Sequence, residues 1–209
     1  MAERRDDEAP RLRRASELES YYEQRADEYD ATSYELVRSD PAARAQLAEL
    51  ERFVAGLAPG HVLDVGCGTG WLTRCLRGRI VGLDPSASML RLARRRVPDA
   101  LLVHAAAPPL PFLERAFDRV FKSHVYGHLD DEGVRRALVR EALRVADELV
   151  VVEQARSPGL SPDGWELRPL RDGSVHRVYK RHFTPAALAD ELGGTTVLAT
   201  AAFVAVRVT

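Results

Sequence analysis

The sequence is poor in lysine, in excess charge of either sign and in long apolar runs. Lys122 and Lys180 are its only lysines, so arginine supplies nearly all of the 30 basic residues. Together with the abundant alanine, this indicates a coding bias towards GC-rich codons, not an RNA-binding signature. The 31 acidic residues leave a formal net charge of −1, so we expect neither nucleic acid nor an anionic membrane as a partner.

Cysteine is also scarce, since Cys67 and Cys75 are the only two. Their spacing matches no zinc site, and we expect neither a metal nor a disulfide. Unpaired cysteines favour a reducing, cytoplasmic location. No run of 18 apolar residues occurs, so we expect no transmembrane helix, and the charged residues 1–8 lack the apolar stretch of a secretory signal.

The length of 209 residues predicts one domain, large enough to bury a core without disulfides or metals. Residues 1–15 mix charges and contain little apolar material, which predicts a disordered tail. Residues 16–58 predict an N-terminal helical lid of two helices. The second begins at Asp40-Pro41, an N-cap residue followed by proline at the first helical position.

Short apolar runs alternate with helical repeats over residues 59–209, which predicts an open α/β sheet with right-handed crossovers. A long irregular excursion at 156–184, on the substrate side, interrupts the alternation and ends in a strand-like stretch at 175–183. Helices are expected at 71–76, 86–96, 130–146 and from Thr184-Pro185 to Gly193, and strands at 61–65, 79–84, 101–104, 117–122, 149–153, 196–200 and 203–208.

A glycine loop after the first strand is the most informative segment. Gly66, Gly68 and Gly70 let the backbone approach a ligand, and the helix expected next would offer free N–H groups. Asp84 ends the second strand, where a carboxylate is placed to accept both hydroxyls of a ribose. A generic strand–helix turn and a helix-capping aspartate stay open as alternatives.

The spacing of the loop argues against a dinucleotide. A dinucleotide fingerprint reads G-x-G-x-x-G, whereas this chain has G-x-G-x-G followed by Trp71. The glycine that permits close packing of helix on strand is missing, and the indole would crowd the phosphate path. A nicotinamide oxidoreductase is therefore disfavoured.

The segment Val62–Gly70, taken with Asp84-Pro85-Ser86 and Met89-Leu90, resembles the class I S-adenosylmethionine (SAM)-dependent methyltransferases. The resemblance covers about residues 20–208. It implies an open, mostly parallel seven-stranded sheet with helices on both faces, whose last hairpin places one strand antiparallel. It also implies SAM as cofactor and S-adenosylhomocysteine (SAH) as product.

The resemblance also implies roles for single residues. Asp64 and the three glycines match the motif that holds the methionine end of the cofactor, with Cys67 contributing backbone only. Asp84 matches the ribose-binding acid, and Met89 an apolar residue near the adenine. Ala106 stands where the family has an aspartate that meets the adenine, so backbone groups or His104 are the alternatives. The cofactor-binding residues expected in this way are Tyr22, Tyr29, Asp64, Gly66, Cys67, Gly68, Gly70, Asp84, Pro85, Met89, Ala105, Ala106 and Ser123.

The loop that leaves the fourth strand is the expected site of chemistry. It reads Ser123-His124-Val125-Tyr126 where amide- and base-methylating members carry Asn/Asp-Pro-Pro-Tyr, which disfavours such acceptors. His124 is the first candidate for a general base, because it follows a strand tip and histidine titrates near neutral pH. A structural role stays open for each histidine. The other candidates are His128, His176, His182, Tyr126 and Glu153.

The sequence thus predicts a methyltransferase that acts on a small-molecule acceptor in specialised metabolism, as a monomer or homodimer. Aromatic residues of the excursion and of the lid, such as Trp165, Tyr179 and Tyr21, are expected to form the acceptor pocket, unless they only pack the lid on the core. An RNA or protein methyltransferase is one alternative. A catalytically silent cofactor-binding regulatory subunit is another, and Ala106 favours it.

Overall fold

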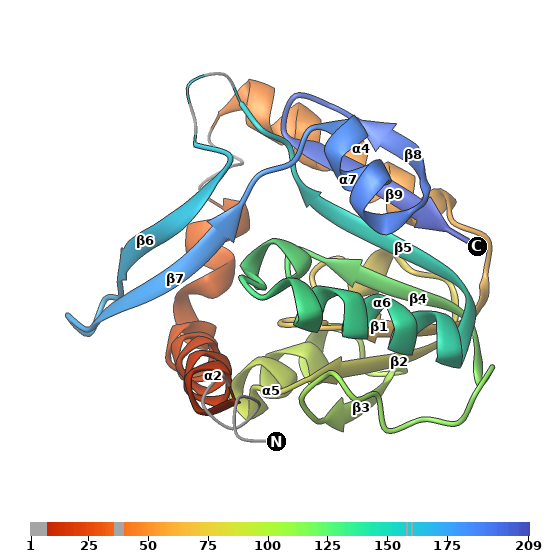
Figure 1. Ribbon diagram of the computed structural model, residues 1–209, viewed down its shortest axis with the longest axis horizontal. Coiled ribbons are helices and arrows are strands. Elements are labelled where there is room, and N and C mark those ends of the chain that lie inside the picture. The colour runs from red at the N-terminus through yellow and green to blue at the C-terminus, as the bar shows by residue number, and fades with distance from the viewer. Residues whose placement is uncertain (1–7, 36–39, 158, 160) are drawn as a thin grey trace.

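A seven-stranded sheet in the order β3-β2-β1-β4-β5-β9-β8 lies at the centre of the computed structural model (Figure 1), which describes residues 8–35, 40–157, 159 and 161–209. Strands β1 to β5 are parallel, and β9 pairs antiparallel with both β5 and β8, which confirms the predicted fold class. The strands are β1 (Gly60–Val65), β2 (Gly78–Asp84), β3 (Leu101–His104), β4 (Phe117–Ser123), β5 (Ala146–Gln154), β8 (Thr195–Ala199) and β9 (Phe203–Val208).

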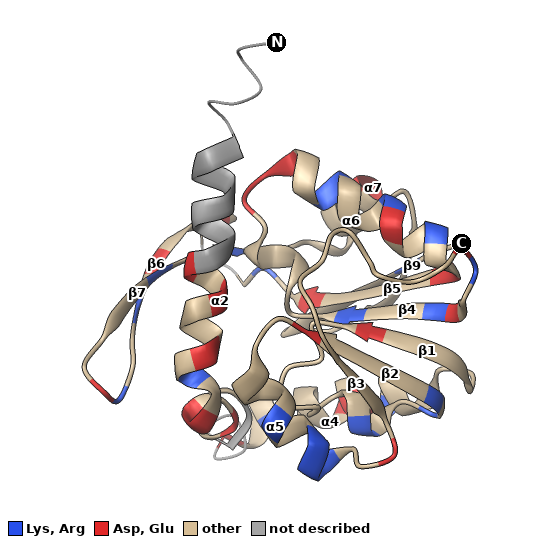
Figure 2. Cartoon of the chain, turned by 90° about the horizontal axis from the view of Figure 1, so that it is seen from below, with Lys and Arg blue, Asp and Glu red and all other residues tan. Residues whose placement is uncertain are grey.

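Helices cover both faces of the sheet (Figure 2). α6 (Glu132–Val145) and α7 (Pro185–Leu192) lie on one face, and α4 (Pro41–Gly56) and α5 (Ala87–Arg96) lie on the other. Strand β5 is apolar on both sides, as a strand buried between two layers must be. Its Val151 packs in the core beneath α6 and α7, and its Val150 packs with α4.

Two helix starts follow the capping chemistry of the sequence. The Asp40 side chain accepts a hydrogen bond from the Ala42 N–H, with Pro41 at the first helical position of α4. Thr184 caps α7 in the same way, and that helix ends at Gly193, which has a left-handed backbone (φ +65°). The predicted limits of these helices are confirmed.

The helix expected at 71–76 is wrong, because only a single 3-10 turn, η2 (Thr73–Cys75), forms there. The connection from β1 to β2 is short, and Leu76 already adopts an extended backbone (φ −69°, ψ 150°) that leads towards β2. The Trp71 indole N–H donates to Glu51 of α4, so the segment is anchored as a loop. The loop itself must therefore supply the N–H groups expected from a helix N-terminus.

The carboxyl ends of the parallel strands are covered by α2 (Glu8–Asp30) and by a hairpin of β6 (Asp163–Pro169) and β7 (Val175–Arg181), together called the cover (Figures 1 and 2). Tyr21 of α2 packs against Val178 of β7 and Leu170 in a small cluster of their own. A π-helical turn, η1 (Ala31–Glu35), follows α2, and a 3-10 turn, η3 (Tyr126–His128), follows β4.

Two expectations about the cover need correction. Helix α2 begins at Glu8, so residues 8–15 of the predicted disordered tail are helical, and residues 1–7 lie outside the described residues. Much of the excursion is also a regular antiparallel hairpin. The sequence does contain a turn signal, the pair Asp172-Gly173. In the structure, Asp172 accepts a hydrogen bond from the Ser174 N–H, and Gly173 has φ +87°. Within the described ranges, no helix is long and apolar enough to cross a membrane.

Candidate active site

The glycine loop is held directly against the end of β2. The N–H groups of Gly66 and Cys67 both donate to the Leu83 carbonyl, at 2.7 and 3.1 Å. Gly66 has φ +77°, and a Cβ there would meet Val125 at 2.6 Å. Gly68 has φ +53°, but a Cβ there would meet nothing within 4 Å, so open space adjoins the loop at this point. The loop therefore requires glycine and has room for a ligand beside it.

Asp84 lies beneath this space with 7% of its surface exposed. Its Oδ2 accepts from the Gly68 N–H at 2.8 Å, and its Oδ1 accepts from the Ser86 N–H at 2.9 Å. Burial raises the pKa of Asp84, and the two N–H donors and Lys122 oppose that shift. Each carboxylate oxygen has a second lone pair free for a ribose hydroxyl, so the residue fixes the loop and is also placed to bind the nucleoside.

Asp64 is buried at the end of β1 and is only half satisfied. Its Oδ2 accepts from the Thr73 hydroxyl at 2.7 Å, whereas its Oδ1 has no hydrogen-bond partner among the described residues. Burial raises the pKa of Asp64 to about 7, against the opposing effects of Thr73 and Lys122. Since a buried carboxylate oxygen is normally paired, this orphaned atom marks the place of a donor or cation.

The remaining cofactor candidates lie around the start of α5. Met89 is buried, and the Ala105 N–H donates to the Asp84 carbonyl at 3.2 Å. The His104 Nε2 donates to the Pro85 carbonyl at 2.7 Å, so this imidazole is engaged at the end of β3. Ala106 is exposed and offers no polar side chain.

Helix α2 binds the same region through two acidic residues to which the sequence analysis gave no role. The Glu23 carboxylate accepts from the hydroxyls of Ser86 and Ser88, both at 2.6 Å, and from the Ser88 N–H. Asp30 accepts from the Thr69 hydroxyl at 2.7 Å and pairs with Arg96 at 2.6 Å. The N-terminal segment is thereby tied to both the glycine loop and α5.

On the other side of the site, Tyr22 and His128 form a fixed pair. The His128 Nδ1 lies 2.7 Å from the Tyr179 carbonyl, which can only accept, so this nitrogen carries the proton. The Nε2 then accepts from the Tyr22 hydroxyl at 2.9 Å. Burial and the neighbouring Lys180 lower the pKa of His128 well below its usual range. His128 is therefore a neutral positioning residue, not a base that titrates near pH 7.

His124 does not have the basicity that the sequence suggested. It is a non-glycine residue with φ +56°, its ring centre lies 5.6 Å from that of Phe203, and its buried Nδ1 has no hydrogen-bond partner among the described residues. Burial and Lys180 lower its pKa to about 3. The expectation of an imidazole that titrates near neutral pH is corrected, although the unpaired nitrogen is still available as an acceptor.

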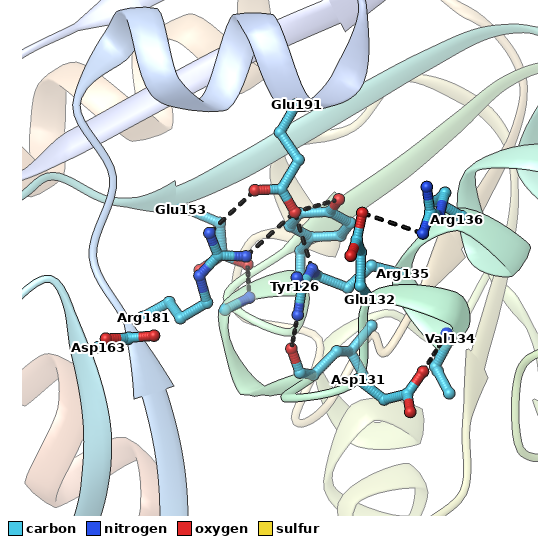
Figure 3. Close-up of polar contacts among 12 residues, drawn as sticks. Tyr126, Asp131, Glu132, Val134, Arg135, Arg136, Glu153, Asp163, Arg181 and Glu191 are labelled. Atoms are coloured by element: carbon cyan, nitrogen blue, oxygen red, sulfur yellow. Dashed lines mark hydrogen bonds and ion pairs between the residues drawn. The ribbon is translucent and has the colours of Figure 1, made fainter.

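Two further candidates are engaged elsewhere. His176 lies 3.2 Å from the Ser174 hydroxyl, and its ring centre is 5.4 Å from that of Tyr21, within the hairpin–α2 contact. The Tyr126 hydroxyl donates to Glu191 of α7, which also binds Arg135 and Arg181 (Figure 3). That network joins η3, α6, α7 and β7, and it occupies the phenol of Tyr126 as a structural contact.

Known proteins resemble this chain in sequence and in fold. Residues 62–148 match the family described as a methyltransferase domain. The solved structure of DhpI with SAH is 30% identical and superposes with a TM-score of 0.70, covering 92% of this chain and 94% of DhpI. The chain belongs to the class I SAM-dependent methyltransferases.

Curated relatives include two with different acceptors in their names. The dTDP-3-amino-3,6-dideoxy-alpha-D-glucopyranose N,N-dimethyltransferase of Streptomyces fradiae is 35% identical, covering 73% of this chain and 55% of that protein. The demethylmenaquinone methyltransferase of Thermotoga maritima is 33% identical, covering 54% and 51%. The alignments span about half the length of these two relatives.

The residues of this methyltransferase fit the cofactor of its family. The half-satisfied Asp64, the paired Asp84 and the open space at Gly68 lie together where β1 and β2 end. An ammonium beside the Asp64 Oδ1 would supply the partner that this oxygen lacks. Among the side chains that the structure describes, no three His, Cys, Asp or Glu residues gather into a group that could hold a metal ion.

The candidate site also contains two buried residues, Lys122 and Lys180, that the sequence analysis noted only for their rarity. They lie at the ends of β4 and β7, and both act electrostatically on Glu153 of β5. Burial lowers the pKa of Lys122 to about 8, and it raises the pKa of Glu153. The scarcity of lysine was the one sequence signal that could have singled out this pair.

Proposed function

We propose that this chain transfers the methyl group of SAM to a small-molecule acceptor that lies between the carboxyl ends of β4 and β5 and the cover. The observation that carries the proposal is the cluster of Asp64, Gly68 and Asp84, whose unused oxygens and open space suit an adenosyl amino acid. When bound, SAM supplies a methyl group on a sulfonium. An electron pair of the acceptor forms the new bond to carbon while the S–C bond breaks, and its electrons remain on sulfur in SAH.

The chain's own residues would act mainly by positioning and desolvation. Asp84 holds the ribose hydroxyls, and the Asp64 Oδ1 holds the ammonium. Helix α2, tied down through Glu23 and Asp30, excludes water from the site. For an acceptor that loses a proton, the Glu153 Oε2 is the group in place to take it, since this buried oxygen has no partner within the described part of the chain.

Relatives support a small acceptor without naming it. The trans-aconitate 2-methyltransferase of Klebsiella pneumoniae is 28% identical, covering 78% of this chain and 75% of that protein. DhpI also has a structure with SAM and HEP, 27% identical with a TM-score of 0.73. These neighbours, and the absence of a basic surplus in this sequence, favour a small molecule of specialised metabolism over RNA or protein.

A calorimetric titration tests the proposal. SAH is expected to bind the wild type, and NADH is not, because Trp71 follows the third glycine. Incubation with SAM and a panel of small metabolites is then expected to release SAH. Binding of NADH more tightly than SAH would reject the proposal, as would an absence of SAH binding.

A further inference from the structure

The two lysines of the chain lie in the same buried place. Only these two of 30 basic residues are lysine, and their exposures are 3% for Lys122 and 5% for Lys180. They come from β4 and β7, which are remote in sequence, and both act electrostatically on Glu153. A coding bias that replaces lysine by arginine on the surface would not by itself leave the last two lysines in one interior location.

Neither ammonium has a close partner within the described part of the chain. Among the described residues, no hydrogen bond or ion pair within 4 Å reaches the Nζ of Lys122 or of Lys180. The Glu153 side chain is fully buried, and its Oε2 also lacks a partner, as does the His124 Nδ1. Buried polar atoms are nearly always paired in native proteins, so the unpaired Glu153 Oε2 and His124 Nδ1, in the same region as two lysine ammonium groups without a partner, indicate a missing ligand.

The two lysines face different parts of that region. Lys122 acts on Asp64 and Asp84 as well as on Glu153, which places it beside the cofactor cluster. Lys180 instead acts on His124 and His128. Lys122 therefore belongs to the cofactor side, and Lys180 belongs to the acceptor side.

The hairpin leaves room beside Lys180. Along β7, His176, Val178 and Lys180 alternate onto the face that meets α2, and the residue paired with Lys180 on β6 is Gly164. A Cβ on Gly164 would meet nothing within 4 Å. The β6 position opposite Lys180 therefore carries no side chain that would cover the lysine, and the space there is open.

Positive charge exceeds negative charge around this opening. The groups that act on Lys180 are Glu153, Glu166, Arg168 and Arg25. Arg168 pairs with Glu166, while Arg25 lies over the Tyr29 ring at 4.8 Å and has no carboxylate partner in the described ranges. Glu153 is then the one buried carboxylate that acts on both Lys122 and Lys180.

We propose that Lys180 binds an oxyanion of the acceptor, a carboxylate or a phosphate-type group, and so selects anionic small molecules. This inference rests on the proposed function, because the acceptor must enter beside Glu153. A lysine suits the task, since its compact ammonium on a flexible stem offers three donors to one oxyanion. The charge surplus and the open position at Gly164 are thereby explained together.

The first test uses the wild type with saturating SAH. Citrate, inorganic phosphate and methylphosphonate serve as anionic probes, and trimethyl citrate serves as the neutral counterpart of citrate. We expect at least one anion to bind in calorimetry and to raise the melting temperature, whereas trimethyl citrate does neither. Equal binding of citrate and its neutral ester, or no binding of any anion, would overturn the inference without any variant.

The second test uses Lys180→Met, which keeps the length of the side chain without its charge. We expect the affinity for the bound anion to fall by about 10- to 100-fold, as for the loss of a charge-assisted hydrogen bond, with the SAH dissociation constant unchanged. Lys180→Arg should recover part of that loss. Arg136→Met removes an exposed cation on α6 and should change nothing.

The outcomes separate the two proposals. Failure of SAH to bind the wild type rejects the proposed function. SAH binding to the wild type and to Lys180→Met, together with equal anion affinity in both, rejects only the acceptor inference. If Lys180→Met does not fold, the acceptor inference is still tested by Lys180→Arg and by the wild-type comparison of citrate with its ester.

Discussion

The cofactor half and the proposed acceptor half of this site are built differently. The cofactor half comes from the ends of two neighbouring strands, and backbone groups do much of the work, such as the Gly68 and Ser86 N–H groups that hold Asp84. The acceptor half comes from α2, the loop after β4, the end of β5 and β7. It relies on side chains, and two of their polar atoms, the His124 Nδ1 and the Glu153 Oε2, have no partner among the described residues.

The difference teaches where function can be read in a sequence. A backbone cradle needs glycine at fixed spacing within one short segment, so its signal is local. A side-chain pocket is assembled from distant segments, each of which carries one or two residues with no spacing in common. The cofactor could therefore be predicted from the sequence, whereas the proposed acceptor site depends on residues from distant segments, such as Lys180, which acts electrostatically on Glu153.

The largest effect should come from breaking the cofactor half at Asp84. In Asp84→Ala, we expect SAH affinity to fall by about 10- to 100-fold through lost charge-assisted contacts. Thermal stability should also drop, because the Gly68 and Ser86 N–H groups lose their acceptor. Asp147→Ala, which alters an exposed pair with Arg115, is the matched control for calorimetry and melting. An unchanged SAH dissociation constant would remove the ribose role.

The next largest effect is expected at Asp64, in the pH dependence of the free energy of unfolding. Its folded pKa of about 7 lies above the ordinary value near 4, so between these values the folded state holds more protons than the unfolded state. Unfolding free energy should therefore fall as pH rises through this window, by up to about 1.4 kcal/mol per pH unit. Asp64→Asn should remove this slope in denaturant titrations at pH 4 to 8. A slope that persists in the variant would contradict the assignment.

A smaller effect is expected from the contact that joins the two halves. Glu23→Ala frees the start of α5 from α2, and we expect SAH affinity to fall by about fivefold because the cover closes less often. Hydrogen exchange at 20–30 should rise in the variant, and in the wild type it should slow when SAH binds. Glu19→Ala, an exposed change on the same helix, should match the wild type.

The smallest effect is expected at His124. With its pKa near 3, this imidazole does not hold a proton at neutral pH and is a weak base. His124→Ala should lower kcat by less than about threefold, with the same pH profile from 6 to 9 once an acceptor is in hand. A loss of 100-fold that shrinks at high pH would restore His124 as the general base.

Much of the fold could be predicted because its determinants are local. Asp40-Pro41 and Thr184-Pro185 mark helix starts, and the doubly apolar β5 marks a buried strand. The absence of a helix at 71–76 could not be predicted, because the apolar spacing of this segment suits a buried turn as well as a helix. The hairpin was missed for a different reason: the prolines of 156–175 obscured the Asp172-Gly173 turn between two alternating strands.

Side-chain roles were predicted less well than backbone roles. The loop glycines and Asp84 lie where the motif implies, but His124 and His128 lose basicity to burial and to Lys180, which no local pattern reveals. Glu23 and Asp30 were hidden among the other acids of α2. Tyr126 was a reasonable candidate by position, yet its hydroxyl donates a hydrogen bond to Glu191 of α7 (Figure 3).

The most direct measurement is a crossed titration of SAH and then citrate or phosphate into the wild type, Asp84→Ala and Lys180→Met. The account predicts that Asp84→Ala weakens SAH binding with little change in anion affinity measured at saturating SAH. Lys180→Met should do the reverse. If both substitutions weaken both ligands to the same degree, or if neither affects the ligand assigned to it, the division of the site into a cofactor half and an anion-binding acceptor half is contradicted.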